Sequence, residues 1–194
     1  MHDARIVQIG WALRRGEAEI YVKERLAKPN GFTISKKAEA FHGISHERAC
    51  SEGLALHDVM TEFIQEMCDL LGEGARLVVH HLEFDCGIIA READRVGLGH
   101  FQDKWADLAR KGFCTMDPCI GKWVRTCKGL QLAPHYGGNI MRLDDMIRCL
   151  APDTFFGARH TAGCDARLHV VLFDALYNMM REASALERNP RAAS

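Results

Sequence analysis

The order of apolar and polar positions predicts a β-hairpin at the start of the chain. Residues 5–13 are rich in β-forming side chains and alternate in part between apolar and polar, which is typical of a strand. Arg14-Arg15-Gly16-Glu17 has the composition of a turn, and residues 19–23 supply a second strand. We therefore expect two antiparallel strands joined by this turn.

The residues that follow the hairpin are predicted to form two helices. Ser35 can cap a short helix that runs to His42 and ends at Gly43. A longer helix is predicted to begin at Ser51 and to end at the break Gly72-Glu73-Gly74, because apolar residues recur between them at roughly helical intervals.

The second half of the chain alternates short apolar strands with helices. Residues 77–79 are wholly apolar, as in a strand buried on both faces, and a helix is predicted over 85–96. Residues 113–116 predict another strand, 121–142 an irregular loop, and 162–182 a last long helix. This order favours an α/β domain with a mixed sheet flanked by helices.

Composition limits the size and charge of the molecule. With 194 residues and 47% hydrophobic content, the chain is long enough for one domain with a real core, which we place at residues 1–183, followed by a frayed tail over 184–194. A net charge of -1 provides no global attraction to nucleic acid or membrane. Residues 104–128 carry a local basic surplus, which fits a phosphate-contacting face or an ordinary solvated surface equally well.

The eight cysteines do not have the pattern of a disulfide scaffold or a zinc site. No Cys-x2-Cys pair occurs, and the first residues do not have the character of a signal peptide. We expect reduced thiols in an intracellular compartment, cytoplasmic or nuclear. No apolar stretch approaches the roughly 20 residues of a membrane span, so no membrane contact is predicted.

Two separated segments carry candidate chemistry. Asp85 follows the apolar run 77–79, and His160 and Asp165 form a His-x4-Asp motif at the head of the last helix. Carboxylates bind hard divalent ions, and an imidazole can accept a proton from water near neutral pH. Taken singly, Asp85 fits a helix N-cap, Asp165 a helix-dipole contact and His160 a surface histidine.

Several short motifs in the same order resemble the DEDDh 3′→5′ exonucleases of the ribonuclease H-like fold, a group that includes polymerase proofreading subunits, the TREX enzymes and RNase T. The resemblance extends from Arg5 to about Leu176. The segments that carry it are Arg5–Gly10, Ala38–Ser45, Val79–Asp85, Cys114–Asp117, Leu143–Met146 and His160–Asp165.

The resemblance implies a site and its ligands. In that family four acidic residues hold two divalent metal ions about 4 Å apart at the scissile phosphate. By position, Asp85 and Asp165 are metal ligands for Mg²⁺ or Mn²⁺, and His160 is the general base. His42-Gly43-Ile44 and His81 are expected to bind the substrate, which would be single-stranded nucleic acid or a 3′ end of DNA or RNA. The resemblance is also compatible with a homodimer or with one part of a larger polypeptide.

One element of the family pattern is missing. No Asp-x-Glu pair occurs in the sequence, although the family carries one on a central first strand that would precede Arg5. We interpret the chain as an N-terminally truncated exonuclease domain without that strand, weak or inactive in phosphodiester hydrolysis. The alternative is a catalytically dead module of the same fold that binds nucleic acid or protein. A cysteine-dependent hydrolase is disfavoured, because the sequence pairs no cysteine with an activating histidine.

Overall fold

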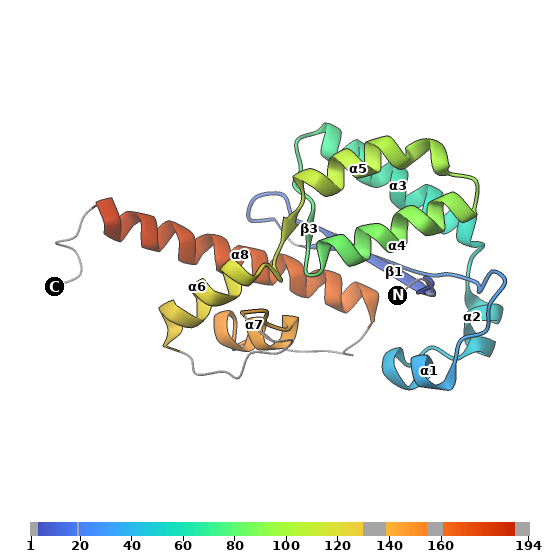
Figure 1. Cartoon of the computed structure of the whole chain (residues 1–194), viewed down its shortest axis with the longest axis horizontal. Coiled ribbons are helices and arrows are strands. Elements are labelled where there is room, and N and C mark those ends of the chain that lie inside the picture. The colour runs from blue at the N-terminus through green and yellow to red at the C-terminus, as the bar shows by residue number, and fades with distance from the viewer. Residues whose placement is uncertain (1–3, 19, 130–138, 155–160, 189–194) are drawn as a thin grey trace.

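The predicted N-terminal hairpin is confirmed. In the computed structural model, which describes residues 4–18, 20–129, 139–154 and 161–188 (Figure 1), β1 (Gln8–Leu13) pairs antiparallel with β2 (Tyr21–Leu26). Gln8 lies opposite Leu26 and Leu13 opposite Tyr21. The observed strands begin two or three residues later than the sequence predicts, but the turn between them is the same.

Local capping signals define the first helix. α1 (Lys36–His42) begins after Ser35, whose side chain accepts a hydrogen bond from the N–H of Ala38. It ends at Gly43, which adopts the left-handed conformation with φ of 72°. Both predicted ends of this helix are therefore confirmed.

The long helix predicted from Ser51 to the break at Gly72 is confirmed by α3 (Leu56–Gly72) except at its start. Ser51 belongs to a separate helix, α2 (His46–Glu52). Leu54 between them is extended: its N–H donates to Leu26 O at 2.9 Å, and its carbonyl accepts from Lys28 N at 2.8 Å. These bonds to the end of β2 replace helical ones, so tertiary pairing overrides the helical spacing at this point.

A second, parallel sheet follows, made of β3 (Val78–Val79) and β4 (Phe113–Cys114). The connection between them contains α4 (Leu82–Arg95), η1 (Gly99–Phe101) and α5 (Gln102–Lys111). The structure is thus mixed α/β, with helices predominating and two small sheets.

The predicted loop over 121–142 is wrong in its first part. α6 (Pro118–Lys128) occupies it, with Asp117 as the N-cap that accepts from Cys119 N at 2.7 Å. Residues 130–138 of that loop lie outside the described part of the chain. α7 (Leu143–Leu150) follows.

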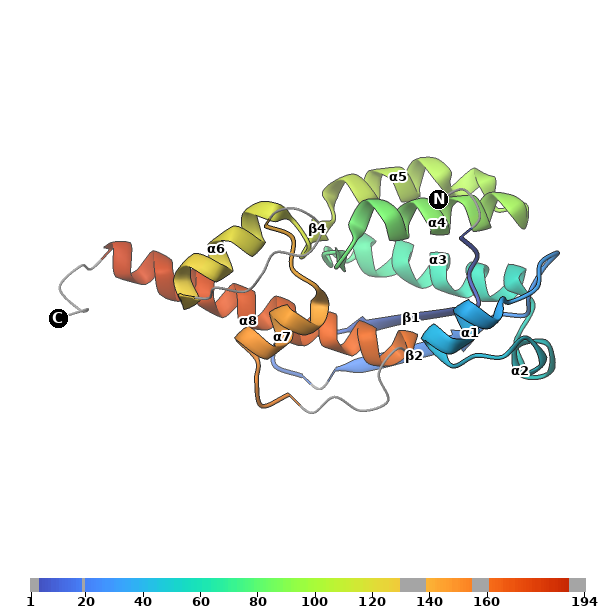
Figure 2. The ribbon, with the colours of Figure 1, turned by 60° about the horizontal axis from the view of Figure 1, so that its bottom comes forward.

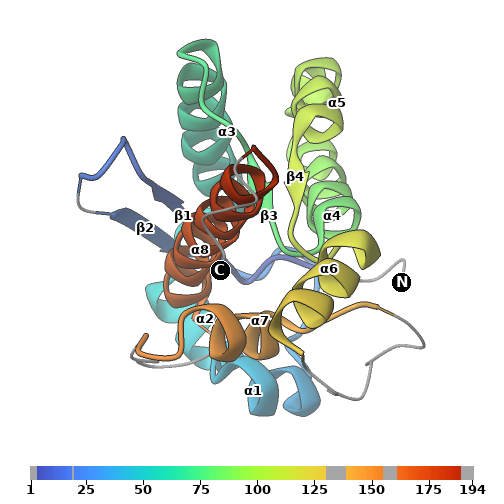
Figure 3. The same ribbon diagram turned by 90° about the vertical axis from the view of Figure 1, so that its left-hand side faces the viewer.

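The last helix, α8 (Ala162–Arg188), is longer than predicted. Residues 184–188 are helical, where the sequence suggests a frayed tail, and residues 189–194 are outside the described ranges. In Figures 2 and 3, α3 and α5 lie at the top of the view and α7 lies towards the bottom, with β1, β2 and α8 between them. α8 packs against β1, β2 and β3, so it spans both sheets.

Each side of the strands has its own hydrophobic core. Under α3 to α5, the Phe63 ring makes edge-to-face contacts with Trp11 at 5.4 Å and with Trp105 at 5.7 Å between centroids. Under α8 lies a second cluster, composed of Val124, Met141, Met146, Ile147, Leu168, Leu172 and Leu176. Trp11 and Trp105 are thus packing residues and do not offer stacking surfaces to nucleic acid.

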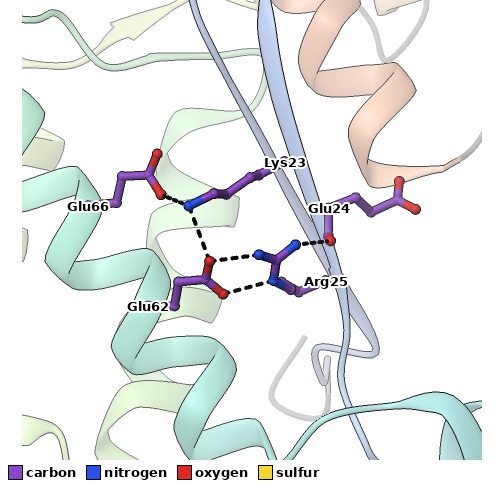
Figure 4. A network of polar contacts seen from close by, with 5 residues as sticks. All are labelled: Lys23, Glu24, Arg25, Glu62 and Glu66. Carbon is purple, nitrogen blue, oxygen red and sulfur yellow. Dashed lines mark hydrogen bonds and ion pairs between the residues drawn. The ribbon is translucent and has the colours of Figure 1, made fainter.

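An ion-pair network joins β2 to α3 (Figure 4). Lys23 Nζ lies 2.6 Å from Glu66 Oε2 and 3.2 Å from Glu62 Oε1, and the Arg25 guanidinium binds both oxygens of Glu62 at 2.8 Å. The contact with Glu66 raises the pKa of Lys23, and the Arg25 guanidinium lowers the pKa of Glu62. These partly exposed pairs mainly orient α3 over the hairpin, since water screens their attraction.

Two further sequence expectations bear on the whole molecule. All eight cysteines carry free thiols. Within the described ranges, every helix is too short or too polar to cross a membrane.

Candidate active site at the ends of β3 and β4

Asp85 lies in the first turn of α4, directly after β3. The N-cap of this helix is His81, so Asp85 is not the N-cap that the simplest structural interpretation requires. Its carboxyl group is largely buried, and this burial raises its pKa to about 6, although His81 opposes the shift through its charge and its backbone N–H. In the described part of the chain, no lysine or arginine forms an ion pair with Asp85. A largely buried carboxylate that has no lysine or arginine partner is unfavourable for stability and suitable for a cation.

Asp165 lies in the first turn of α8, where the helix start is heavily capped. Each of the first four backbone N–H groups has an acceptor: Gln8 Oε1 for Ala162, Glu24 Oε2 for Gly163, Thr161 Oγ1 for Cys164 and Thr161 O for Asp165. Asp165 shares a helix face with His169, Leu172 and Leu176, because these positions follow at intervals of about one helical turn. Leu172 and Leu176 are buried, so this face points into the molecule.

Two histidines that the sequence analysis did not select lie on this inner side. His80 directly follows β3, and its Nδ1 lies 2.9 Å from Oγ1 of the buried Thr115, just beyond β4. The His80 ring stacks on that of His169 in α8, with centroids 6.2 Å apart and planes inclined by 21°. Burial lowers the pKa of both histidines to about 4, so both rings are neutral at pH 7.

The sequence contains features that could have indicated these two histidines. His80 directly follows the apolar run 77–79, and His169 stands four residues after Asp165 on the same helix face. Asp144 in the first turn of α7 also acts on His80, since its charge favours the protonated ring. The polar groups thus gather at the carboxyl ends of two parallel strands, where ligands of α/β sheets commonly bind.

The described residues do not assemble a complete metal site. No three His, Cys, Asp or Glu side chains within them come close enough together to hold a metal ion. The donor chemistry of Asp85 and Asp165 nevertheless fits a hard divalent cation, because both supply carboxylate oxygens and the largely buried Asp85 carboxyl forms no ion pair with a described lysine or arginine. His160, the expected general base, lies outside the described ranges.

The predicted substrate-binding residues differ in their accessibility. His81 is exposed and stacks on Phe84 at 5.2 Å, beside Asp85. His42 Nδ1 accepts a hydrogen bond from Ile44 N at 3.1 Å across the exposed Gly43. The Ile44 side chain is only 2% exposed and packs with Ile34 and Ala49, so it supports this loop from inside. Figures 1 and 2 show α1 at the same end of the molecule as the start of α8.

Local contacts engage part of the basic surplus of residues 104–128. Asp107 pairs with both Arg110 and Lys111 on α5, and Arg125 hydrogen-bonds to Asn139. These contacts leave the net charge of the segment unchanged but occupy three of its six basic side chains.

An apolar cavity of about 390 Å³ lies between α6 and the second half of α8. It is lined by Phe113, Cys119, Ile120, Trp123, Leu176, Met180, Ala183 and Ser184. None of these side chains is charged, so the cavity does not suit a phosphate group.

A cysteine–histidine pair that the sequence analysis missed occurs on α2. Cys50 Sγ lies 3.6 Å from His46 Nε2, at an i, i+4 spacing. Because His46 Nδ1 accepts a hydrogen bond from Ile34 N, the neutral ring carries its proton on Nε2. That nitrogen can donate to the sulfur but cannot take its proton, so the pair does not provide an activated nucleophile.

Comparison with known proteins adds no relative: no family model matches the chain, and no curated protein matches its sequence. The functional argument accordingly depends on the motifs and the geometry described above.

Proposed function

We propose that this chain is a ribonuclease H-like domain of the DEDDh type that hydrolyses phosphodiester bonds at nucleic-acid 3′ ends with divalent cations. The observation that carries the proposal is Asp85, a largely buried carboxylate at the end of a parallel strand, with Asp165 on the inner face of α8. Burial of an ionisable group costs stability, and such groups concentrate at functional sites.

The arrangement of the strands supports the fold assignment. Within the described chain, the edge of β1 opposite β2 and the edge of β3 opposite β4 pair with no strand. Figure 3 shows the two sheets on either side of α8, which contacts β1 and β3. A strand that paired with both of these edges would join the two sheets into one, which is the position expected for the central strand of the ribonuclease H-like fold.

The residues then have distinct roles. Asp85 and Asp165 hold Mg²⁺ or Mn²⁺, which when bound stabilises charge on the attacking and leaving oxygens. His160 accepts the proton of the attacking water. The stacked pair His81 and Phe84, together with the exposed loop at His42 and Gly43, contacts the end of the nucleic acid.

One observation favours a second candidate function. Since the described residues lack a group of three metal ligands, the chain also fits a catalytically dead module that retains nucleic-acid or protein binding. The two candidate functions differ in whether digestion of nucleic acid occurs and depends on divalent cations and on Asp165.

The test uses the full chain with a 5′-labelled single-stranded oligonucleotide and Mn²⁺. We expect a ladder of 3′-shortened products that disappears in Asp165→Asn and persists in Asp153→Asn, a matched change at an exposed turn. Digestion that is unchanged in Asp165→Asn contradicts the proposed site. A folded chain that binds the oligonucleotide without digesting it supports the binding module.

A further inference from the structure

The start of α8 is held by two side chains from the hairpin. Gln8 Oε1 accepts from Ala162 N at 2.9 Å, and Glu24 Oε2 accepts from Gly163 N at 2.6 Å. The helix already has a capping residue in Thr161, whose hydroxyl accepts from Cys164 N. A carboxylate at a helix N-terminus adds a charge-assisted bond to the positive end of the helix dipole.

A third contact fixes the direction of the helix along the strand. Arg14, just beyond β1, pairs with Asp174 of α8 at 2.8 Å. The six residue steps from Gln8 to Arg14 span about 20 Å of strand, and the twelve steps from Ala162 to Asp174 span about 18 Å of helix. Because these lengths agree, the contacts can form together only if α8 runs parallel to β1 in this register.

Glycine permits the close approach that these bonds require. A Cβ atom on Gly10 would lie 2.3 Å from both the carbonyl carbon and the oxygen of Ala162. A Cβ on Gly163 would lie 2.9 Å from the carboxylate of Glu24. The helix start therefore lies directly on the hairpin backbone, with little room to slide or rotate.

This register determines where Asp165 points. Each helical residue turns the side-chain direction by about 100°, so a shift of α8 by one residue would rotate His169 away from its stack on His80, and Asp165, one helical turn before His169, would rotate with it. The buried face at Leu168, Leu172 and Leu176 stabilises the helix, but apolar contacts tolerate small shifts better than directed hydrogen bonds do.

We propose that Glu24 and Gln8 are positioning residues, which hold the first turn of α8 so that Asp165 stays on the inner helix face of His169, whose ring stacks on His80 just after β3. This inference rests on the proposed function, in which Asp165 is a cation ligand. It assigns a role to Glu24, which lies outside every motif of the family resemblance, and to Gln8, which lies within the segment Arg5–Gly10.

The experiment combines amide hydrogen exchange over residues 162–165 with Mn²⁺ affinity, measured from the electron paramagnetic resonance of free Mn²⁺. In Glu24→Ala we expect exchange about tenfold faster and Mn²⁺ binding about tenfold weaker, as loss of one charge-assisted hydrogen bond predicts. Glu24→Gln retains an acceptor oxygen and should stay within about threefold of the wild type. Glu17→Ala removes an exposed hairpin carboxylate at the turn and should match the wild type in both measurements.

Gln8→Ala provides an independent variant, since it removes the neighbouring acceptor without changing the charge. Wild-type Mn²⁺ affinity in both Glu24→Ala and Gln8→Ala would overturn the positioning role, whatever the exchange rates. The Asp165→Asn variant distinguishes failure of the positioning role from failure of the proposed function. If Mn²⁺ binding depends on Asp165 but not on Glu24 or Gln8, only the positioning role fails. If the folded wild type does not bind Mn²⁺, or binds it independently of Asp165, the proposed function fails as well.

Discussion

Replacing Asp85 with Asn is expected to stabilise the cation-free protein at neutral pH. Burial raises the pKa of this carboxyl from 3.8 to about 6, so the folded state holds its proton more tightly than the unfolded state does. A difference of about 2.2 units at 1.36 kcal/mol per unit amounts to about 3 kcal/mol.

Because the pKa of Asp85 is higher in the folded state than in the unfolded state, the protein loses stability as the pH rises. Above about pH 6 the folded protein carries the full cost of the buried charge, and this cost disappears as the pH falls through 6 towards 3.8. Asn has nearly the same shape, keeps an acceptor for the His81 N–H and does not titrate. Asp85→Asn should therefore be up to about 3 kcal/mol more stable than the wild type at pH 8, with the difference vanishing near pH 4.

Urea denaturation in EDTA at pH 8, 6 and 4 measures this difference, with Asp153→Asn as the exposed control. Saturating Mn²⁺ should then raise the stability of the wild type more than that of Asp85→Asn, because the variant has lost one of the two carboxylates that bind the cation. If Asp85 instead acts through the helix dipole, Asn should cost about 0.3–1 kcal/mol at pH 8. A variant that is equally or less stable than the wild type at pH 8 would refute the argument from burial.

Three further predictions concern stability. His169→Phe keeps an aromatic ring in the stack and should remove up to about 3 kcal/mol of the stability that the wild type loses between pH 6.5 and 4, because the folded His169, with its pKa of about 4, takes up its proton at a lower pH than the unfolded ring does. Urea denaturation across this pH range tests the prediction, and the same loss of unfolding free energy in both proteins would contradict it. Glu92→Gln should destabilise the fold by about 1–3 kcal/mol, because the fully buried carboxylate binds two arginines; an unchanged urea midpoint would show that those pairs add nothing. Gly10→Ala should lower the melting temperature by several degrees, because its Cβ would collide with Ala162, whereas Gly72→Ala, with open space around it, should not; equal melting temperatures would disprove the close approach.

Much of the hairpin and of α1 follows from the sequence because their determinants are local. The alternation of residues 5–13 and the turn at Gly16 depend on neighbours a few positions away. Ser35 and Gly43 likewise bound α1 through bonds and torsions within one turn.

The predictions fail where a distant segment competes with local preference. Helical spacing continues through Leu54, but the end of β2 binds its backbone and separates α2 from α3. The register of α8 is similarly decided by Gln8 and Glu24, more than 135 residues away along the chain.

By itself, the sequence identifies an α/β chain and selects Asp85 and Asp165 as site candidates, since hydrophobic period and motif order are properties of the chain alone. Tertiary structure alone determines that Asp85 is buried with a raised pKa and that His80 stacks on His169. Burial and through-space contact depend on how separated segments pack, and the pKa of a side chain changes only once water around it has been displaced.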